Sequence, residues 1–241
     1  MKAPDQSNYL KWKMWDPDAF GRCPTELRHY YEKEIPLVLI RAKPVLEIGF
    51  GNGTFLGWLQ ANGTIPYGIE LDPELRKRGE KLLGPGRVFE SLDSTGLQRL
   101  NGGFSGIVAF DVIEHVPEEE LPAFFSRMHA LLADDGVIVL RFPNGDSPFG
   151  RIWQHGDIAH KTTIGKYKLK YFALCTGLDV RQLRQPAVPI LGSGCRQAIR
   201  RTMIRLARKA IEKPLRALYF PGENIPLDPL YVAVLRKTVT R

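Results

Sequence analysis

The chain has 241 residues, of which 44% are hydrophobic and 10% aromatic, and its formal net charge is +8. This composition excludes a disordered polypeptide, and the length suits one α/β domain with a sizeable core. We expect a cytoplasmic protein, because the sequence shows neither an apolar run of about 20 residues nor an apolar N-terminal signal. Three widely spaced cysteines, Cys23, Cys175 and Cys195, favour reduced thiols over a disulfide framework or a Cys-x-x-Cys metal site.

The first predicted element is an N-terminal helical segment over residues 8–41, ahead of the first strand. Its aromatic side chains either form a lid over a ligand site or extend the core. These aromatic residues are Trp12, Trp15, Phe20, Tyr30 and Tyr31.

A glycine-rich turn follows the first predicted strand. Apolar residues 45–48 run into Gly49, Gly51 and Gly53, and an apolar-periodic helix begins at Thr54. Glycine has no Cβ, so such a turn can adopt positive φ, and the helix start offers free N–H groups to a ligand. The spacing differs from the G-x-G-x-x-G fingerprint of dinucleotide sites, and the Gly-Lys-Ser/Thr of a Walker A loop is absent.

The pattern Glu-x-Gly-x-Gly-x-Gly over residues 47–53 resembles motif I of the class I S-adenosylmethionine (SAM) methyltransferases. In that family the glycine loop accommodates the methionine part of SAM, and the acid lies near its α-amino group. An anionic acid suits the sulfonium and ammonium of SAM, whereas it would repel a pyrophosphate. The alternative is an ordinary tight turn after a solvated acid. The resemblance implies a cofactor site that includes Glu47, Gly49, Phe50, Gly51, Asn52 and Gly53.

The second predicted strand, residues 65–70, ends in an acid about twenty residues beyond the glycines, where a carboxylate can accept hydrogen bonds from both ribose hydroxyls. We therefore predict that Glu70 binds the ribose and that Leu71 belongs to the same site. Asp72 is the competing candidate. It stands directly before a proline and a helix over residues 73–82, an arrangement typical of a helix N-cap.

Two further strands, residues 87–90 and 104–110, precede more candidate cofactor residues. The resemblance implies that Asp93 receives the adenine amino group, although it could equally be a solvated loop residue. The run over residues 110–117 resembles the segment after strand four in methyltransferases related to the ubiquinone-biosynthesis enzymes, where a Glu-His pair opens the next helix. The fourth strand departs from that pattern, because it begins Phe-Ser instead of Phe-Asp. The cofactor residues expected here are Asp111, Val112 and His115, of which His115 either contacts the cofactor region or orients the turn.

Helices and strands alternate along the remaining chain, which indicates βαβ units around a parallel sheet with ligands at the carboxyl ends of its strands. We expect helices over 118–133 and 166–175 and strands over 136–142, 178–183 and 231–235. The fold class is α/β, and the resemblance implies a Rossmann-like, seven-stranded, mostly parallel sheet with helices on both faces and an antiparallel last strand. We predict one methyltransferase domain over 1–241, made of the N-terminal segment 8–41, a cofactor-binding core with an acceptor loop over 42–185, a basic helical insertion over 186–228, and the last strand and tail over 229–241.

The connection over residues 143–162 is the predicted acceptor loop, because a loop of some twenty residues in a compact domain is usually functional. It resembles the Pro-Asn and Gly-Asp-x-x-His pattern of methyltransferases from bacterial surface-polysaccharide biosynthesis. Transfer to a sugar hydroxyl needs a base, and an imidazole suits cellular pH. His160 is therefore the predicted general base, and Asp157 either orients it or binds the acceptor. Alternatively, His160 closes the loop through a backbone hydrogen bond.

Other residues of this loop also have two interpretations. Trp153 either stacks on a sugar face or anchors the loop in the core. His155, Asp157 and His160 could hold a metal by residue type, but the family pattern does not require one, and we expect no metal.

A basic segment lies between Cys195 and Phe220. It contains eight Lys/Arg residues and a single acid, Glu212, so it carries +7 of the net charge of +8. Apolar residues recur there at helical spacing, which predicts a basic amphipathic helix before the last strand. Such a helix is typical of elements that lie on an anionic membrane surface, and a solvated face packed on the domain is the alternative. A nucleic-acid surface is not expected, because aromatic residues are not interleaved with the arginines. The apolar residues are Ile199, Met203, Leu206, Ala210 and Ile211.

The sequence thus predicts a SAM-dependent methyltransferase that O-methylates a sugar hydroxyl of a bacterial surface glycan or of its lipid-linked precursor. The alternatives are O-methylation of another small or lipophilic molecule, such as a quinone precursor or natural product, and a SAM-binding module without catalysis. RNA methylation is less favoured. We expect the protein at the cytoplasmic face of the membrane if the basic helix binds lipid, and the sequence leaves the oligomeric state open.

Overall fold

The computed structural model describes residues 15–35, 43–188, 194–223 and 225–238. The beginning and end of the predicted N-terminal segment, including Trp12, lie outside the described residues.

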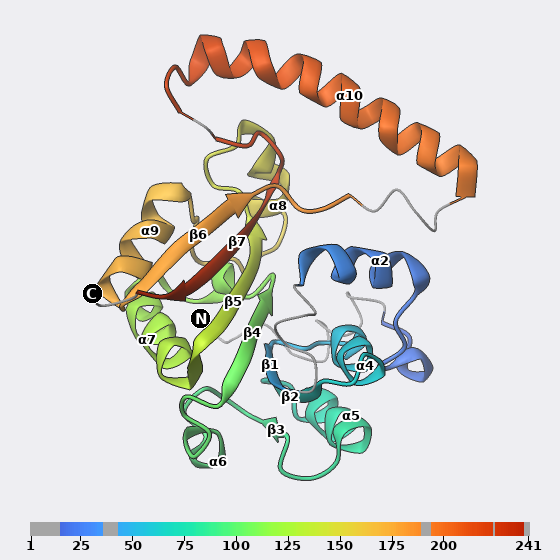
Figure 1. Ribbon diagram of the computed structural model, residues 1–241, viewed down its shortest axis with the longest axis vertical. Helices are drawn as coiled ribbons and strands as arrows, with labels where there is room; N and C mark the ends of the chain where they lie inside the picture. Colours follow the sequence, from blue (N-terminus) through green and yellow to red (C-terminus); the bar gives the residue numbers. More distant parts are fainter. Residues whose placement is uncertain (1–14, 36–42, 189–193, 224, 239–241) are drawn as a thin grey trace.

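A seven-stranded sheet in the order β3-β2-β1-β4-β5-β7-β6 forms the centre of the molecule (Figure 1). Strands β1 to β5 pair in parallel, whereas β7 runs antiparallel to both β5 and β6. This confirms the expected α/β fold with a mostly parallel sheet and an antiparallel last strand. The strands are β1 (Pro44–Ile48), β2 (Ile65–Ile69), β3 (Val88–Phe89), β4 (Phe104–Phe110), β5 (Leu132–Pro143), β6 (Leu178–Arg184) and β7 (Leu230–Lys237).

Helices cover both faces of the sheet. Side chains of a strand point alternately to its two sides, so apolar residues on each side can pack against helices. In β1, Leu46 packs into a core cluster with α7 (Leu121–Leu131) and α9 (Lys166–Cys175), while Val45 packs into a second cluster with α2 (Thr25–Glu34) and α4 (Thr54–Ala61). Figure 1 accordingly shows α2 and α4 on one side of the sheet and α7 and α9 on the other. The remaining helices are α5 (Pro73–Leu83), α6 (Thr95–Gln98), α8 (Arg151–His155) and α10 (Gly194–Tyr219), with 3-10 turns η1 (Pro17–Ala19), η2 (Ile113–His115), η3 (Glu118–Glu120) and η4 (Pro148–Gly150).

Several element boundaries differ from the sequence expectation, including the strand predicted over 136–142, which begins earlier, at Leu132. The helix predicted over 118–133 is a 3-10 turn followed by α7, which starts at Leu121 with Pro122 in its first turn and ends before β5 begins at Leu132. Proline favours the first turn of a helix, where its missing N–H is not needed. The third strand has two residues, because only Gly68 and Ile69 of β2 pair with it.

Strand β4 begins Phe-Ser, where the family pattern has Phe-Asp, and this serine has a structural role. Ser105 Oγ donates to the Pro44 carbonyl of β1 at 3.0 Å.

The N-terminal aromatic residues divide by position between the glycine loop and the core, and a lid over the ligand stays a prediction. Trp15 and Phe20 lie against the glycine loop, where a Cβ added at Gly51 would be 2.7 Å from the Trp15 ring. Tyr30 and Tyr31 of α2 are buried in the core, with the Tyr31 ring 4.9 Å from that of Phe55. The first pair covers the loop, and the second pair extends the core.

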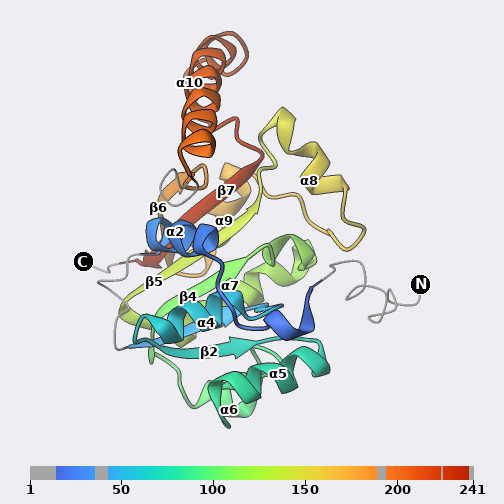
Figure 2. The same ribbon diagram turned by 90° about the vertical axis from the view of Figure 1, so that its right-hand side faces the viewer.

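The basic segment forms the predicted helix, α10, between β6 and β7. Both views place it at one end of the molecule, beyond β6 and β7 (Figures 1 and 2). None of the described helices is both long enough and apolar enough to cross a bilayer.

Candidate active site

The glycine loop joins β1 to α4 and adopts a conformation that requires glycine. Gly49, Gly51 and Gly53 have φ values of +70°, +50° and +69°, in the left-handed region that side chains with a Cβ rarely occupy. A Cβ at Gly49 would also stand 2.7 Å from a methyl group of Val112. The loop is held by the Ile69 carbonyl of β2, which accepts from Gly49 N at 2.8 Å. The loop therefore requires glycine at these positions, because the protein's own side chains pack against its backbone, with Trp15 at Gly51 and Phe20 at Gly53 as well.

The two other loop residues of the predicted cofactor set turn their side chains toward the protein. Phe50 is buried in a cluster with Leu56 and Leu75. The Asn52 side chain accepts from Thr54 N at 3.3 Å and from the Thr54 hydroxyl, so it closes the first turn of α4. Both side chains support the loop.

Glu47 is a buried acid at the end of β1, only 5% exposed. Its Oε2 has no hydrogen-bond partner among the described residues. Burial, and then the nearby charge of Glu70, raise the pKa of Glu47 well above its usual value. A buried carboxylate with an unsatisfied oxygen favours a cationic group, so the α-ammonium of SAM fits this position.

Glu70 follows β2 and is hydrogen-bonded to the glycine loop. Its Oε2 accepts from Gly51 N at 2.9 Å, and its Oε1 accepts from the backbone N–H of Leu71 at 2.8 Å and of Asp72 at 3.2 Å. Burial raises the pKa of this carboxyl, and the Gly51 N–H lowers it. A carboxylate oxygen has two acceptor positions, so Oε2 can take one ribose hydroxyl in addition to Gly51.

The neighbours of Glu70 divide into a structural residue and an exposed one. Asp72 is the N-cap of α5, accepting from Glu74 N at 2.8 Å and Leu75 N at 2.9 Å, as the sequence predicted. Leu71 is exposed beside the acid, where an apolar surface is available to a ligand.

The candidates after β3 and β4 are held by arginines. Asp93 is exposed and forms an ion pair with Arg127 of α7 at 2.6 Å, so its predicted adenine contact competes with this pairing. Asp111 adopts φ +56° and accepts from Arg141 Nε of β5 at 3.0 Å. The Arg141 guanidinium lies 4.9 Å from the centre of the Phe110 ring. Asp111 and Arg141 thus fix the turn that presents Val112 to Gly49.

Two histidines and a buried glutamate meet where the acceptor loop contacts this turn. The rings of His115 and His160 lie edge to face with centroids 4.7 Å apart. His160 Nε2 is 3.9 Å from Glu114 Oε1, and Glu114 is 1% exposed. The Glu114 carbonyl accepts from Lys161 N at 2.8 Å and Thr162 N at 3.0 Å. The loop is therefore anchored to the turn beside His160.

Backbone carbonyls determine which nitrogen of each histidine ring carries the proton. His160 Nδ1 lies 3.1 Å from the Gln154 carbonyl, and His115 Nδ1 lies 3.2 Å from the Ala159 carbonyl. A carbonyl oxygen only accepts, so each Nδ1 donates, and each neutral ring carries its lone pair on Nε2. The His160 lone pair therefore lies on the side of Glu114. Burial, and then Asp111, raise the pKa of Glu114 to about 8, which keeps this carboxyl neutral at lower pH.

The structure corrects the sequence interpretation of several loop residues. Trp153 is 56% exposed, so the alternative that it anchors the loop in the core is wrong. Asp157 acts through the backbone around His160: its carboxylate accepts from Ala159 N at 2.9 Å and its carbonyl from His160 N at 3.2 Å. Among the described residues, the ligand atoms that lie within 4.8 Å of one another belong to Glu114, His115 and His160, so this set, and not the one with His155, could hold a metal.

Sequence reasoning missed Glu114 and Gln154 as site residues. Glu114 had a signal, since it is the acid of the Glu-His pair, but its burial depends on packing under the acceptor loop. Gln154 acts through its carbonyl, which every residue type has, so no side-chain pattern could have found it.

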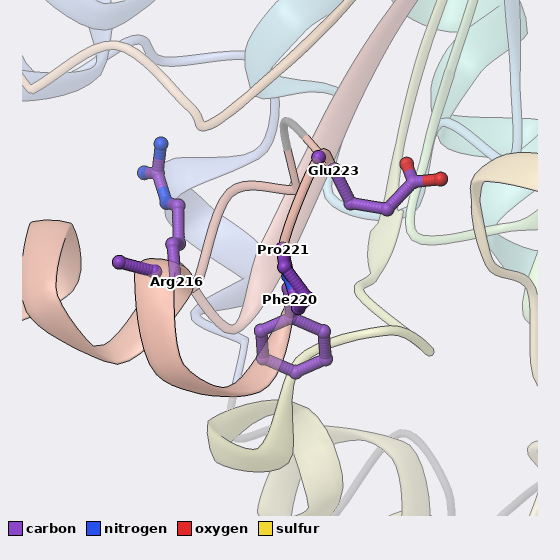
Figure 3. Close-up of a pocket in the computed structure, with 6 residues that line it drawn as sticks. Arg216, Phe220, Pro221 and Glu223 are labelled. Carbon is purple, nitrogen blue, oxygen red and sulfur yellow. The ribbon is translucent and has the colours of Figure 1, made fainter.

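A separate depression lies at the C-terminal end of α10, with a volume of about 340 Å³ (Figure 3). In this view the side chains of Arg216 and Glu223 point away from each other. None of the predicted cofactor or catalytic residues lines it, so it is distinct from the site at the glycine loop. Its lining residues are Arg216, Ala217, Phe220, Pro221, Gly222 and Glu223.

Comparison with known proteins assigns the family. The sequence model of a family described as "Methyltransferase domain" matches residues 11–184. The chain belongs to this family, and it is a class I SAM-dependent methyltransferase. One structural match is a SAM-dependent methyltransferase from Archaeoglobus fulgidus, with a TM-score of 0.62, 18% identity, and coverage of 97% of this chain and 100% of that one.

Two further similarities come from proteins with lipid names. The mycolic acid cyclopropane synthase CmaA1, in complex with S-adenosylhomocysteine (SAH) and CTAB, has a TM-score of 0.56 and 16% identity over 95% of this chain and 93% of that one. Sphingolipid C9-methyltransferase A of Emericella nidulans is 27% identical over 130 residues, which are 51% of this chain and 24% of that protein. The chain therefore matches about a quarter of that relative's length. At these identities the structural matches show the fold alone.

SAM is thus the cofactor of this methyltransferase, and the residues at the end of β1 fit it. The orphaned oxygen of buried Glu47 suits an ammonium beside the positive-φ glycine loop. For the individual residues two predictions remain: Glu47 binds the ammonium of SAM, and Glu70 binds its ribose.

Proposed function

We propose that this methyltransferase transfers a methyl group to a hydroxyl of a sugar in a surface glycan or its lipid-linked precursor. The observation that carries the proposal is the setting of His160. Its Nδ1 is engaged by the Gln154 carbonyl, its Nε2 carries the lone pair, and its ring packs against His115 on the turn that reaches Gly49 through Val112. His160 is thus linked to the glycine loop through His115 and Val112 of the same turn.

Bound SAM supplies an electrophilic methyl group on a sulfonium, which an acceptor oxygen takes as the carbon–sulfur bond breaks. A hydroxyl is a weak nucleophile, so its proton has to leave as the new bond forms. His160 Nε2 accepts that proton, and the Gln154 carbonyl stabilises the resulting imidazolium through Nδ1–H.

The exposed side chains of the acceptor loop favour an acceptor with both a sugar and an apolar part. Trp153 is accessible for stacking on a sugar face, and Ile152 and Ile158 are 81% and 90% exposed near it in sequence. The second candidate is a lipophilic hydroxyl acceptor without a sugar. It is favoured by the partial similarity to a sphingolipid methyltransferase.

The experiment supplies labelled SAM and compares three acceptor pools: lipid-linked glycans extracted from cell envelopes, the same glycans after the lipid is cleaved off, and simple lipophilic alcohols. We expect label in the first pool as a methyl ether. Label only in the alcohols would favour the second candidate. Label on carbon or nitrogen would overturn hydroxyl transfer, and the failure of all pools would leave SAM binding without demonstrated catalysis.

His160→Ala tests the base, with His155→Ala as the matched control, because His155 is an exposed histidine on the same loop. We expect His160→Ala to keep SAM affinity and to lower kcat by about 10²-fold or more, whereas His155→Ala keeps kcat. Asp157→Ala should lose less than His160→Ala. Full turnover in His160→Ala would assign His160 to loop closure.

Chelation separates proton acceptance from metal binding at the same cluster. We expect kcat to survive treatment with EDTA, since proton transfer to His160 needs no cation. A loss that Mg²⁺, Mn²⁺ or Zn²⁺ restores would instead assign Glu114, His115 and His160 to a cation site.

A further inference from the structure

Helix α10 is attached to the domain by one side. Arg201 pairs with Glu26 of α2 at 3.5 Å, and Arg208 pairs with Asp228, ahead of β7, at 3.0 Å. Arg201 is partly buried, as are Ala198 and Leu215. These positions lie on one side of a helix with 3.6 residues per turn. The side that faces the domain therefore carries two paired arginines, together with the partly buried Ala198 and Leu215.

The opposite side of α10 is apolar and uncovered. Ile199, Met203 and Leu206 follow one another at steps of four and three residues, which aligns them along one stripe. They are 64%, 64% and 59% exposed. A surface helix of a soluble domain normally buries its apolar stripe against the core, so α10 has the reverse orientation. The stripe is available to a partner.

Basic side chains border this stripe on both sides. Arg196 and Arg200 lie along one border and Lys209 and Lys213 along the other, and all four are exposed. None of the four forms an ion pair within the part of the chain that the structure describes. An apolar stripe between two basic borders matches an anionic bilayer, in which acyl chains lie beneath negative headgroups.

The helix also lies at the end of the sheet where the acceptor loop begins. The last residue of β5, Pro143, pairs with Leu230 at the start of β7, and Arg184 at the end of β6 pairs with Val232. The acceptor loop leaves from β5, and α10 is inserted between β6 and β7 at this same end (Figure 2). A membrane bound by α10 would therefore lie on the acceptor side of the enzyme.

We propose that the outward face of α10 docks the enzyme on anionic lipid bilayers, with Ile199, Met203 and Leu206 inserted among the lipids and Arg196, Arg200, Lys209 and Lys213 on their headgroups. This surface does not depend on which acceptor is methylated. The inward arginines, Arg201 and Arg208, hold the helix on the domain.

The test is sedimentation of the full chain with vesicles of phosphatidylglycerol and phosphatidylcholine in equal parts, and with vesicles of phosphatidylcholine alone. We expect binding to the anionic vesicles at low salt that weakens as salt screens the charges, and little binding to neutral vesicles. Two variants divide the surface: a border variant with Gln at Arg196, Arg200, Lys209 and Lys213, and a stripe variant with Gln at Ile199, Met203 and Leu206. Each should lower the partition coefficient about 10²-fold, and Gln preserves helix propensity.

The matched control replaces four exposed basic residues elsewhere by Gln: Lys77, Lys81, Arg99 and Lys170. It changes the net charge equally and should bind vesicles like the parent. An equal loss of vesicle binding in this control would show that binding depends on net charge alone, and it would overturn the proposed docking surface. Sedimentation velocity without vesicles tests a second copy as occupant: a parent that self-associates through the stripe and ignores vesicles also overturns the proposal. SAM affinity is measured in every variant, so failure of docking is distinguishable from loss of the methyltransferase core.

Discussion

The two halves of the ligand-binding edge are built from contacts of different range. At the cofactor half, Gly51 and Glu70 are 19 residues apart, and the Asn52 side chain reaches only to Thr54. At the acceptor half, Asn144 donates to the carbonyls of Pro226 and Asp228, 82 and 84 residues away. The cofactor half is thus encoded in a short motif, whereas the acceptor half is assembled from distant segments. A substitution should therefore disturb binding in the first half and folding in the second.

The largest effect is expected at the cofactor half, from Gly51→Ala. The new Cβ would meet Trp15 at 2.7 Å and force an alanine into φ +50°. We expect SAM affinity to fall by about 10²-fold or more, since the loop must move away from its support at Glu70. Calorimetric titration measures it.

Gly102→Ala is the matched control, because Gly102 has φ +70° but nothing within 4 Å of an added Cβ. It carries the same kind of backbone strain far from the loop in sequence, and it should keep SAM affinity. Equal affinity in the parent and Gly51→Ala would contradict the placement of the cofactor.

The acceptor half should respond through stability, and Asn144→Ala tests this. The buried amide donates to Pro226 O at 2.8 Å and Asp228 O at 2.9 Å, and its Oδ1 accepts from Asp146 N at 3.0 Å. Its loss leaves buried backbone groups unpaired, so we expect unfolding free energy to drop by about 2–3 kcal/mol with SAM affinity retained. Urea denaturation measures it, and Asn101→Ala, at an exposed turn, should change little. A stable variant with weak SAM binding would reverse the comparison.

The same difference in range explains how much the sequence could predict. The strand over 104–110 and the helix over 166–175 have the predicted bounds, because apolar periodicity and flanking breakers are local signals. The glycine conformations and the Asp72 cap followed in the same way, since each depends on a few adjacent residues.

The partners of the acceptor half could not be read from the sequence. His160 was predicted as a base, but the groups around its ring, Glu114 and the Gln154 carbonyl, come together only when the loop folds onto the turn after β4. The same limit holds in the cofactor half for the pairing of Asp111 with Arg141, which are 30 residues apart. For α10 the periodicity predicted the helix, while the side facing the domain depended on Glu26 and Asp228.

A smaller effect on the cofactor half is expected from Glu70→Ala. The substitution removes an acceptor for the ribose and three backbone contacts, so SAM affinity should weaken by about 1–3 kcal/mol. Glu80→Ala, an exposed acid on α5, is the control in the same titration. If Glu70→Ala binds SAM like the parent, Glu70 supports the loop and the ribose lies elsewhere.

The smallest effect concerns proton binding in the acceptor half, through Glu114. Its pKa is raised from 4.5 to about 8, so between these values the folded protein holds a proton that the unfolded chain releases. The contribution of this carboxyl to stability is therefore complete below about pH 4.5 and is lost as pH rises toward 8. Glu114→Gln keeps a neutral group of similar shape without the titration. We expect the loss of unfolding free energy between pH 5 and pH 8 to shrink by about 1 kcal/mol or more in this variant, as measured by urea denaturation.

The raised pKa values of Glu47 and Glu70 are common to parent and variant, so the difference between the two proteins isolates Glu114. The exposed Glu119→Gln should retain the parent's dependence on pH. If Glu114→Gln does so too, Glu114 is already ionised in the fold, and the imidazole of His160 faces a carboxylate, which would favour a charged histidine over a neutral base.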